Sequence, residues 1–181
     1  MSEPLTPDEE RACLALARGA LERYFEGGGR LRVPAGKGVL KEKRGAFVTL
    51  TVEGDLRGCI GYPLPVKPLD ETVVEMAVAA ASQDTRFEPL RPDEMGKLGI
   101  EISVLGLPEP VGDPGEVEVG RHGIIVSQGW NKGLLLPQVP VEHGWDRETY
   151  LGHGCLKAGL PPDAWKKGAK IEVFTAQVFS E

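Results

Sequence analysis

The hydrophobic positions near the start of the chain repeat at the spacing of an amphipathic helix. Apolar residues recur three or four positions apart between Cys13 and Tyr24. A capping box with proline at the first helical position precedes them, in the segment Thr6-Pro7-Asp8-Glu9. Three glycines at 27–29 follow the pattern and predict its end. The sequence therefore predicts a first helix, with Cys13 buried on its apolar face as a small hydrophobe.

The next stretch alternates between apolar and polar residues, which is the period of a strand. Residues 46–52 show this alternation, Glu53-Gly54-Asp55 predicts a turn, and residues 56–60 return as a second strand. Successive side chains of a strand point to opposite faces of its sheet. We therefore expect Arg57 and Cys59 on the same face of a hairpin.

The remaining pattern predicts further helices and strands joined by short loops. A second helix is expected over 69–82, with a face of small residues, and a third from Asp146 to about 158. Strands are expected over 100–104, 117–120, 124–127, 133–136 and 171–178. Hairpins dominate and strict alternation of strands and helices is missing. We therefore predict an α+β fold, mostly antiparallel, with helices packed on one face of the sheet.

Composition and charge place the chain among globular proteins. It has 181 residues, of which 41% are hydrophobic and 27% charged, enough for one domain or two small subdomains packed together. The net charge of −6 disfavours nucleic-acid binding, which requires basic patches. No apolar run reaches about 18 residues, so no membrane span is expected. The N-terminal segment has neither a basic nor an apolar signal region, and we expect a cytoplasmic protein.

Cys59 is the first candidate for chemistry. It is one of three widely spaced cysteines, a number and spacing that do not suggest a disulfide framework. It lies between two glycines and beside an arginine, in Leu56-Arg57-Gly58-Cys59-Ile60-Gly61. A neighbouring guanidinium favours the thiolate, so Cys59 is a candidate nucleophile or thiolate ligand. The alternative is a packed thiol on a strand whose glycines serve a tight sheet corner.

Three further residues are candidates with structural alternatives. His122 could act as a general base or ligand, or cap a turn through backbone hydrogen bonds. Asp84 and Arg86 flank one residue and could receive a charged ligand, or form an ion pair that fixes a connector. We expect at least one of these two to lie within reach of the strand that carries Cys59. His143, His153 and Cys155 lack the spacing of a structural zinc site, and no metal site is expected.

Several segments in the same order resemble the AMMECR family, named after the Alport-syndrome, midface-hypoplasia and elliptocytosis chromosomal region. They are the hexapeptide 56–61, Asp84-x-Arg86-Phe87-x-Pro89, Ile102-Ser103-Val104-Leu105, Val119-Gly120-Arg121-His122-Gly123-Ile124, Leu136-Pro137-Gln138-Val139 and Gly144-Trp145-Asp146. The resemblance covers most of residues 1–181. The cysteine at position 155 resembles the prokaryotic branch of the family. The family has no settled biochemical activity.

The resemblance also implies a fold and a pathway. It implies a compact domain with a larger and a smaller subdomain and the hexapeptide near a cleft between them. Prokaryotic relatives are often encoded with a Memo-type protein and a radical-SAM protein, which are therefore the expected partners. The resemblance names no substrate and no cofactor.

Two functional hypotheses follow. The first is an enzyme, or the catalytic-accessory subunit of one, with catalytic residues Arg57, Cys59 and His122. Its expected binding residues are Gly58, Gly61, Asp84 and Arg86. The alternative is a non-catalytic adaptor that binds a partner protein and in which Cys59 is structural. An open pocket around the candidate residues favours the enzyme, and a fully buried Cys59 favours the adaptor.

Overall fold

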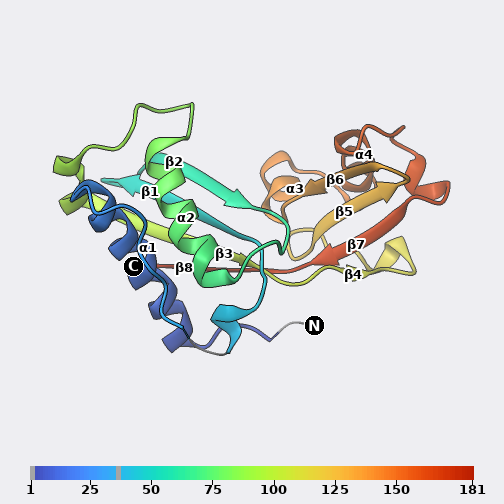
Figure 1. Ribbon diagram of the computed structural model, residues 1–181. Helices are drawn as coiled ribbons and strands as arrows, with labels where there is room; N and C mark the ends of the chain where they lie inside the picture. The colour runs from blue at the N-terminus through green and yellow to red at the C-terminus, as the bar shows by residue number, and fades with distance from the viewer. Residues whose placement is uncertain (1–2, 36–37) are drawn as a thin grey trace. The chain divides into compact units, whose positions relative to one another are not determined.

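The structure is a computed structural model that describes residues 3–35 and 38–181 (Figure 1). It contains two compact units. The larger unit comprises residues 3–105 and 177–181, and the smaller unit comprises residues 106–176. Each unit has a four-stranded sheet and its own helices. The predicted α+β class is confirmed.

The larger unit is built on a sheet with strand order β2-β1-β3-β8. Its strands are β1 (Ala46–Val52), β2 (Asp55–Tyr62), β3 (Leu98–Leu105) and β8 (Ala176–Ser180). The central strand β1 pairs antiparallel with both β2 and β3. Both residues of the β1–β2 turn, Glu53 and Gly54, have positive φ, as a tight two-residue hairpin requires. The expected hairpin is therefore present, and β2 forms an edge of the sheet.

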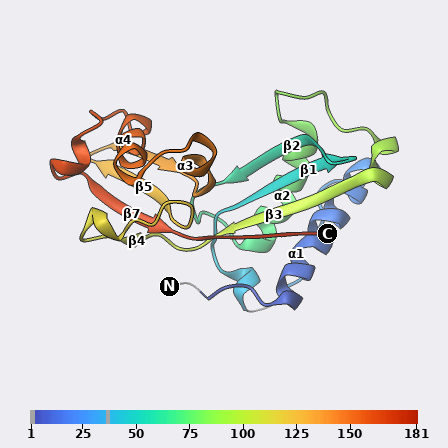
Figure 2. The same cartoon turned by 180° about the vertical axis from the view of Figure 1, so that it is seen from behind.

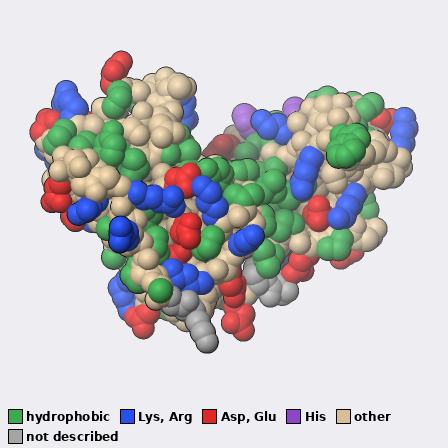
Figure 3. Space-filling view, viewed as in Figure 1, with side chains coloured by type: hydrophobic (Ala, Val, Ile, Leu, Met, Phe, Trp, Pro, Cys, Tyr) green, Lys and Arg blue, Asp and Glu red, His purple; other side chains and the backbone are tan. Residues whose placement is uncertain are grey.

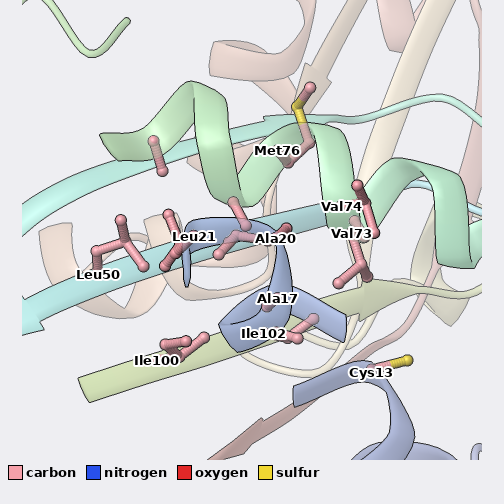
Figure 4. Close-up of a cluster of buried hydrophobic side chains, with 14 of the residues drawn as sticks. Cys13, Ala17, Ala20, Leu21, Leu50, Val73, Val74, Met76, Ile100 and Ile102 are labelled. Atoms are coloured by element: carbon pink, nitrogen blue, oxygen red, sulfur yellow. The ribbon is translucent and has the colours of Figure 1, made fainter. Parts of the chain in front are cut away.

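Two helices cover one face of this sheet (Figures 1 and 2). They are α1 (Pro7–Phe25), which starts with the predicted capping box, and α2 (Leu69–Ser82). Figure 4 shows the core between these helices and the strands, where Leu21 and Val73 meet Leu50 and Ile102. Because alternate residues of a strand face opposite sides, the residues between these core positions lie on the other face of the sheet. We call that other side the open face.

The smaller unit has a second sheet with strand order β4-β7-β5-β6. Its strands are β4 (Glu109–Pro110), β5 (Gly123–Gln128), β6 (Asn131–Leu135) and β7 (Lys170–Phe174), and its helices are α3 (Gln138–His143) and α4 (Arg147–Lys157). Tyr150 of α4 is fully buried, and its hydroxyl lies 3.0 Å from the carbonyl oxygen of His122 and 3.2 Å from that of Leu135. This side chain ties α4 to the ends of β5 and β6.

The structure corrects two predictions about elements and adds one helix. Residues 117–120 are not a strand, because the N–H groups of Arg121 and His122 donate to the carbonyl of Glu118 and close a turn. The predicted final strand 171–178 is divided at Thr175 into β7 and β8, which belong to different sheets. Helix α3 was not predicted. Among the described residues, no helix combines the length and apolarity needed to cross a membrane.

Candidate functional site

Cys59 lies on the open face of the larger unit's sheet. It pairs with Thr49 of β1, whose neighbours Val48 and Leu50 are fully buried in the core under the helices. The Thr49 hydroxyl donates a hydrogen bond to the Cys59 Sγ, at an oxygen-to-sulfur distance of 3.2 Å. Cys59 is half-buried and forms no disulfide. The thiol is therefore held by a hydroxyl donor and is partly accessible.

Asp84 fixes the backbone of Cys59 at the outer edge of β2. The Cys59 N–H donates to Asp84 Oδ2 at 2.9 Å, which confirms that the 84–86 segment reaches the Cys59 strand. The Arg86 guanidinium donates to both oxygens of the same carboxylate, at 3.0 and 2.7 Å. The hydrogen bonds from Arg86, and then that from Cys59, hold the pKa of Asp84 well below its usual range. Asp84 is therefore a carboxylate that links Arg86 to the strand of Cys59.

Arg57 faces a different set of partners from those expected. The pairing of β1 with β2 shifts register so that Leu50 opposes Gly58 and Thr51 opposes Leu56. Arg57 is the extra residue of this bulge, where the simple alternation of faces fails. Its guanidinium donates to both oxygens of Glu94 at 2.8 and 2.9 Å, and to the backbone carbonyls of 88 and 89. Arg57 therefore fixes the connector that precedes β3, and no hydrogen bond or ion pair joins it to Cys59 in the described part of the chain.

Close packing explains why both positions 58 and 61 of the hexapeptide are glycine. A Cβ on Gly58 would lie 2.1 Å from the carbonyl oxygen of Ala80, so α2 can approach β2 only if this residue is glycine. A Cβ on Gly61 would lie 2.5 Å from the ring of Phe47. Gly58 is buried under α2, and its predicted role in binding stays a prediction. Gly61 pairs with Phe47 in the row next to Cys59.

A polar row crosses the open face through Cys59. Thr49 pairs with Cys59 on one side and with Glu101 of β3 on the other. Glu101 is exposed, and no hydrogen bond or ion pair joins its side chain to another residue in the described part of the chain. Sequence reasoning missed both Thr49 and Glu101, because only the register of strand pairing places them in line with the thiol. The signal available in the sequence was limited to their polar character within alternating strands.

His122 belongs to the smaller unit and has a local partner there. Its Nδ1 accepts a hydrogen bond from the N–H of Glu118 at 3.1 Å, and its own N–H donates to the Glu118 carbonyl at 2.9 Å. These two bonds brace the turn that leads into β5. They correspond to the turn-capping alternative for His122, and they leave Nε2 as the ring nitrogen with no bond to another described residue.

The other cysteines and histidines do not form a metal centre in the described ranges 3–35 and 38–181, where no group of three potential ligands gathers. Cys13 is fully buried, and burial raises the pKa of its thiol to about 12, with a further contribution from Asp70. Cys155 is also fully buried, and burial raises its pKa. His143 and His153 each stack on Trp145, with ring centroids 4.7 and 3.8 Å from that of the tryptophan. Cys59 is thus the accessible thiol.

Charges of both signs are interspersed on the face of the molecule seen in Figure 3. Lys and Arg side chains there are mixed with Asp and Glu. Ion pairs of the larger unit include those of Arg30 with Glu71 and Glu75. A stripe of one sign, which nucleic-acid binding requires, is not the pattern of that face.

Comparisons with known proteins give consistent relatives. A family model described as AMMECR1 matches residues 14–179. Protein MK0488 of Methanopyrus kandleri is 51% identical to this chain over 191 aligned positions, which cover 100% of this chain and 92% of the relative. A protein of Methanothermobacter thermautotrophicus is 46% identical to this chain, and the alignment covers 98% of this chain and 97% of the relative. The crystal structure of the uncharacterized protein PH0010 from Pyrococcus horikoshii superimposes with a TM-score of 0.80 at 42% identity, over 98% of this chain and 93% of that chain.

Proposed function

We propose that this chain, which belongs to the AMMECR1 family, carries out thiol chemistry at Cys59. It does so as an enzyme, or as a catalytic-accessory subunit that acts with the Memo-type and radical-SAM proteins implied by its sequence. The observation that carries this proposal is the hydrogen bond from Thr49 to a half-buried Cys59 thiol on the open face.

The residues around Cys59 take distinct roles in this proposal. Thr49 supplies a donor that stabilises a thiolate, because a thiolate accepts hydrogen bonds more strongly than a thiol does. Asp84 holds the backbone N–H of Cys59 and so fixes the position of the sulfur. Arg86 brings a positive charge to the same place, the contribution that the sequence pattern led us to expect from Arg57. Arg57 is a positioning residue, and His122 braces its turn in the smaller unit.

The buried cysteines provide an internal contrast. Cys13 and Cys155 are fully buried, with thiol pKa values raised by burial, so both stay protonated and shielded at neutral pH. Iodoacetamide should therefore modify Cys59 faster than Cys13 in the folded protein. Equal rates would indicate that Cys59 is an inert packed thiol.

Substitution of Cys59 by serine tests the proposal. Cys59→Ser preserves size and the bond to Thr49 but removes most of the nucleophilicity. We expect the variant to keep its melting temperature within a few degrees and to fail to complement loss of the gene. Ser103→Ala, in the next row of the same sheet face, is the control and should complement. A stable Cys59→Ser protein that complements fully would overturn the proposal.

One observation favours the adaptor alternative. Trp130, in the turn between β5 and β6, is fully exposed, and an exposed tryptophan is a common anchor for a protein partner. Under the adaptor hypothesis, Trp130→Ala loses complementation while Cys59→Ser retains it. Under the thiol hypothesis, the pattern of the two variants is reversed.

A further inference from the structure

Arg86 is held in a fixed position but remains open to a ligand. Its Nε and Nη2 donate to Asp84, and its backbone N–H donates to the same carboxylate at 3.2 Å. The Phe87 ring lies 5.4 Å from the guanidinium carbon. In the described part of the chain, no hydrogen bond uses the Arg86 Nη1. The guanidinium is thus oriented before any ligand arrives, and one of its nitrogens has donors to spare.

Exposure decides which charge of the Asp84–Arg86 pair a ligand meets. The Asp84 side chain is 7% exposed, whereas that of Arg86 is 58% exposed. The Asp84 carboxylate accepts hydrogen bonds from Cys59 and Arg86 within the protein, whereas the Arg86 guanidinium is exposed to solvent. The hydrogen bond to Asp84 also raises the pKa of Arg86, so the outward-facing guanidinium keeps its positive charge at neutral pH.

The opposite side of Cys59 carries the reverse charge. Glu101 lies two strands away from Cys59 in the same row, beyond Thr49. Two strand spacings correspond to about 10 Å between backbones. Because the Glu101 carboxylate has no partner among the described residues, it repels an anion on that side of the row. An anionic group beside Cys59 is therefore directed toward Arg86.

We propose that Arg86 docks an anionic group, a carboxylate or a phosphate, of the molecule that reacts at Cys59. This inference rests on the proposed thiol chemistry and specifies its substrate class. A guanidinium offers paired N–H donors that match the oxygens of either anion. The substrate carries its electrophilic atom close to that anion, within reach of the Cys59 sulfur.

Two alkylating agents that differ in charge test this class directly. Iodoacetate is an anion and iodoacetamide is neutral; with either, the Cys59 thiolate forms a sulfur–carbon bond and iodide leaves. The protein is treated with an equimolar mixture at low salt, and the two adducts on the Cys59 peptide are quantified by mass spectrometry. Both reagents need the same thiolate, so the ratio of adducts cancels any change in the ionised fraction and reports the local charge.

Arg86→Gln should lower the ratio of carboxymethyl to carbamidomethyl adduct roughly threefold, the size expected for one exposed charge. Arg86→Lys should retain most of the wild-type ratio because the charge remains. Arg11→Gln is the matched control, since Arg11 also forms an exposed pair with an aspartate but belongs to α1, on the helix-covered face. Its ratio should equal that of the wild type.

Salt gives a second measurement that needs no variant. In about 0.5 M NaCl, which screens exposed charges over a few ångströms, the wild-type ratio should fall to the value of Arg86→Gln. A ratio that responds neither to Arg86→Gln nor to salt overturns the anion-docking inference. If Arg86→Gln does not fold, the salt response alone decides. The proposed thiol function is judged separately by complementation with Cys59→Ser, so the two proposals can fail independently.

Discussion

Asp84 is the residue that connects the parts of the Cys59 site. One carboxylate accepts the N–H of an edge-strand residue, the N–H of Arg86 and the guanidinium of Arg86. Edge strands have N–H groups without a strand partner, and a buried N–H without an acceptor is costly. A single aspartate therefore caps the free edge of β2 at Cys59 and holds the arginine there.

Asp84→Asn should destabilise the protein by about 1–3 kcal/mol at pH 7, because it removes charge-assisted hydrogen bonds. The folded-state pKa of Asp84 is lowered, chiefly by Arg86, so this stabilisation is present above the unfolded pKa and is lost as pH falls. The difference in free energy of unfolding between the wild type and Asp84→Asn, measured in urea, should therefore become smaller from pH 7 to pH 3. The exposed residue Asp93 offers a control, and Asp93→Asn should change little at either pH.

Local signals predicted the helices well, whereas strand partners required the folded structure. The capping box and the apolar spacing specify α1 within the chain itself, and α2 spans the predicted residues. Alternation continues through Thr175, but it does not reveal that β7 and β8 pair in different sheets. The bulge at Arg57 is likewise invisible to alternation. The site was predictable where a residue touches its neighbours in sequence, as Asp84 and Arg86 do, and not where register across strands decides.

Gly58→Ala tests the packing of α2 against β2. The added Cβ would meet the carbonyl oxygen of Ala80 at 2.1 Å, so helix and strand must separate. Overpacking of this kind typically costs about 1–3 kcal/mol. Gly96→Ala is the control, since nothing lies within 4 Å of its new Cβ. Urea unfolding should show a lower midpoint for Gly58→Ala and little change for Gly96→Ala; an unchanged midpoint for both would contradict the close packing.

At the scale of the whole molecule, the smaller unit is an insertion between β3 and β8 of the larger one. The ends of the insertion meet, because the Gly106 N–H donates to the Thr175 carbonyl at 2.8 Å. The strand that follows the insertion carries Gln177, which bonds to the backbone of Leu5, and ends next to Glu181, which pairs with Arg18 of α1. Residues 177–181 are thus held by hydrogen bonds and an ion pair to α1 and to the segment that precedes it.

Replacement of residues 107–174 by a short glycine-rich turn should leave a larger unit that folds. Its ends are already adjacent and its core lies between α1, α2 and its own sheet. We expect one cooperative unfolding transition in urea. The same replacement combined with deletion of 177–181 should unfold at clearly lower urea, because β8 and its contacts with α1 are lost. A non-cooperative transition in the first variant would show that the larger unit depends on the smaller one.

The order of the strands along the chain affects how the protein is made. The ribosome releases β3 before the whole of the smaller unit and β8 after it. At ordinary rates of synthesis that interval is on the order of ten seconds. During that time β3 presents an unpaired edge, which is an open template for another nascent chain. Delayed pairing of this edge is therefore a consequence of the strand order, and contact between nascent chains at β3 is the hazard that this order creates.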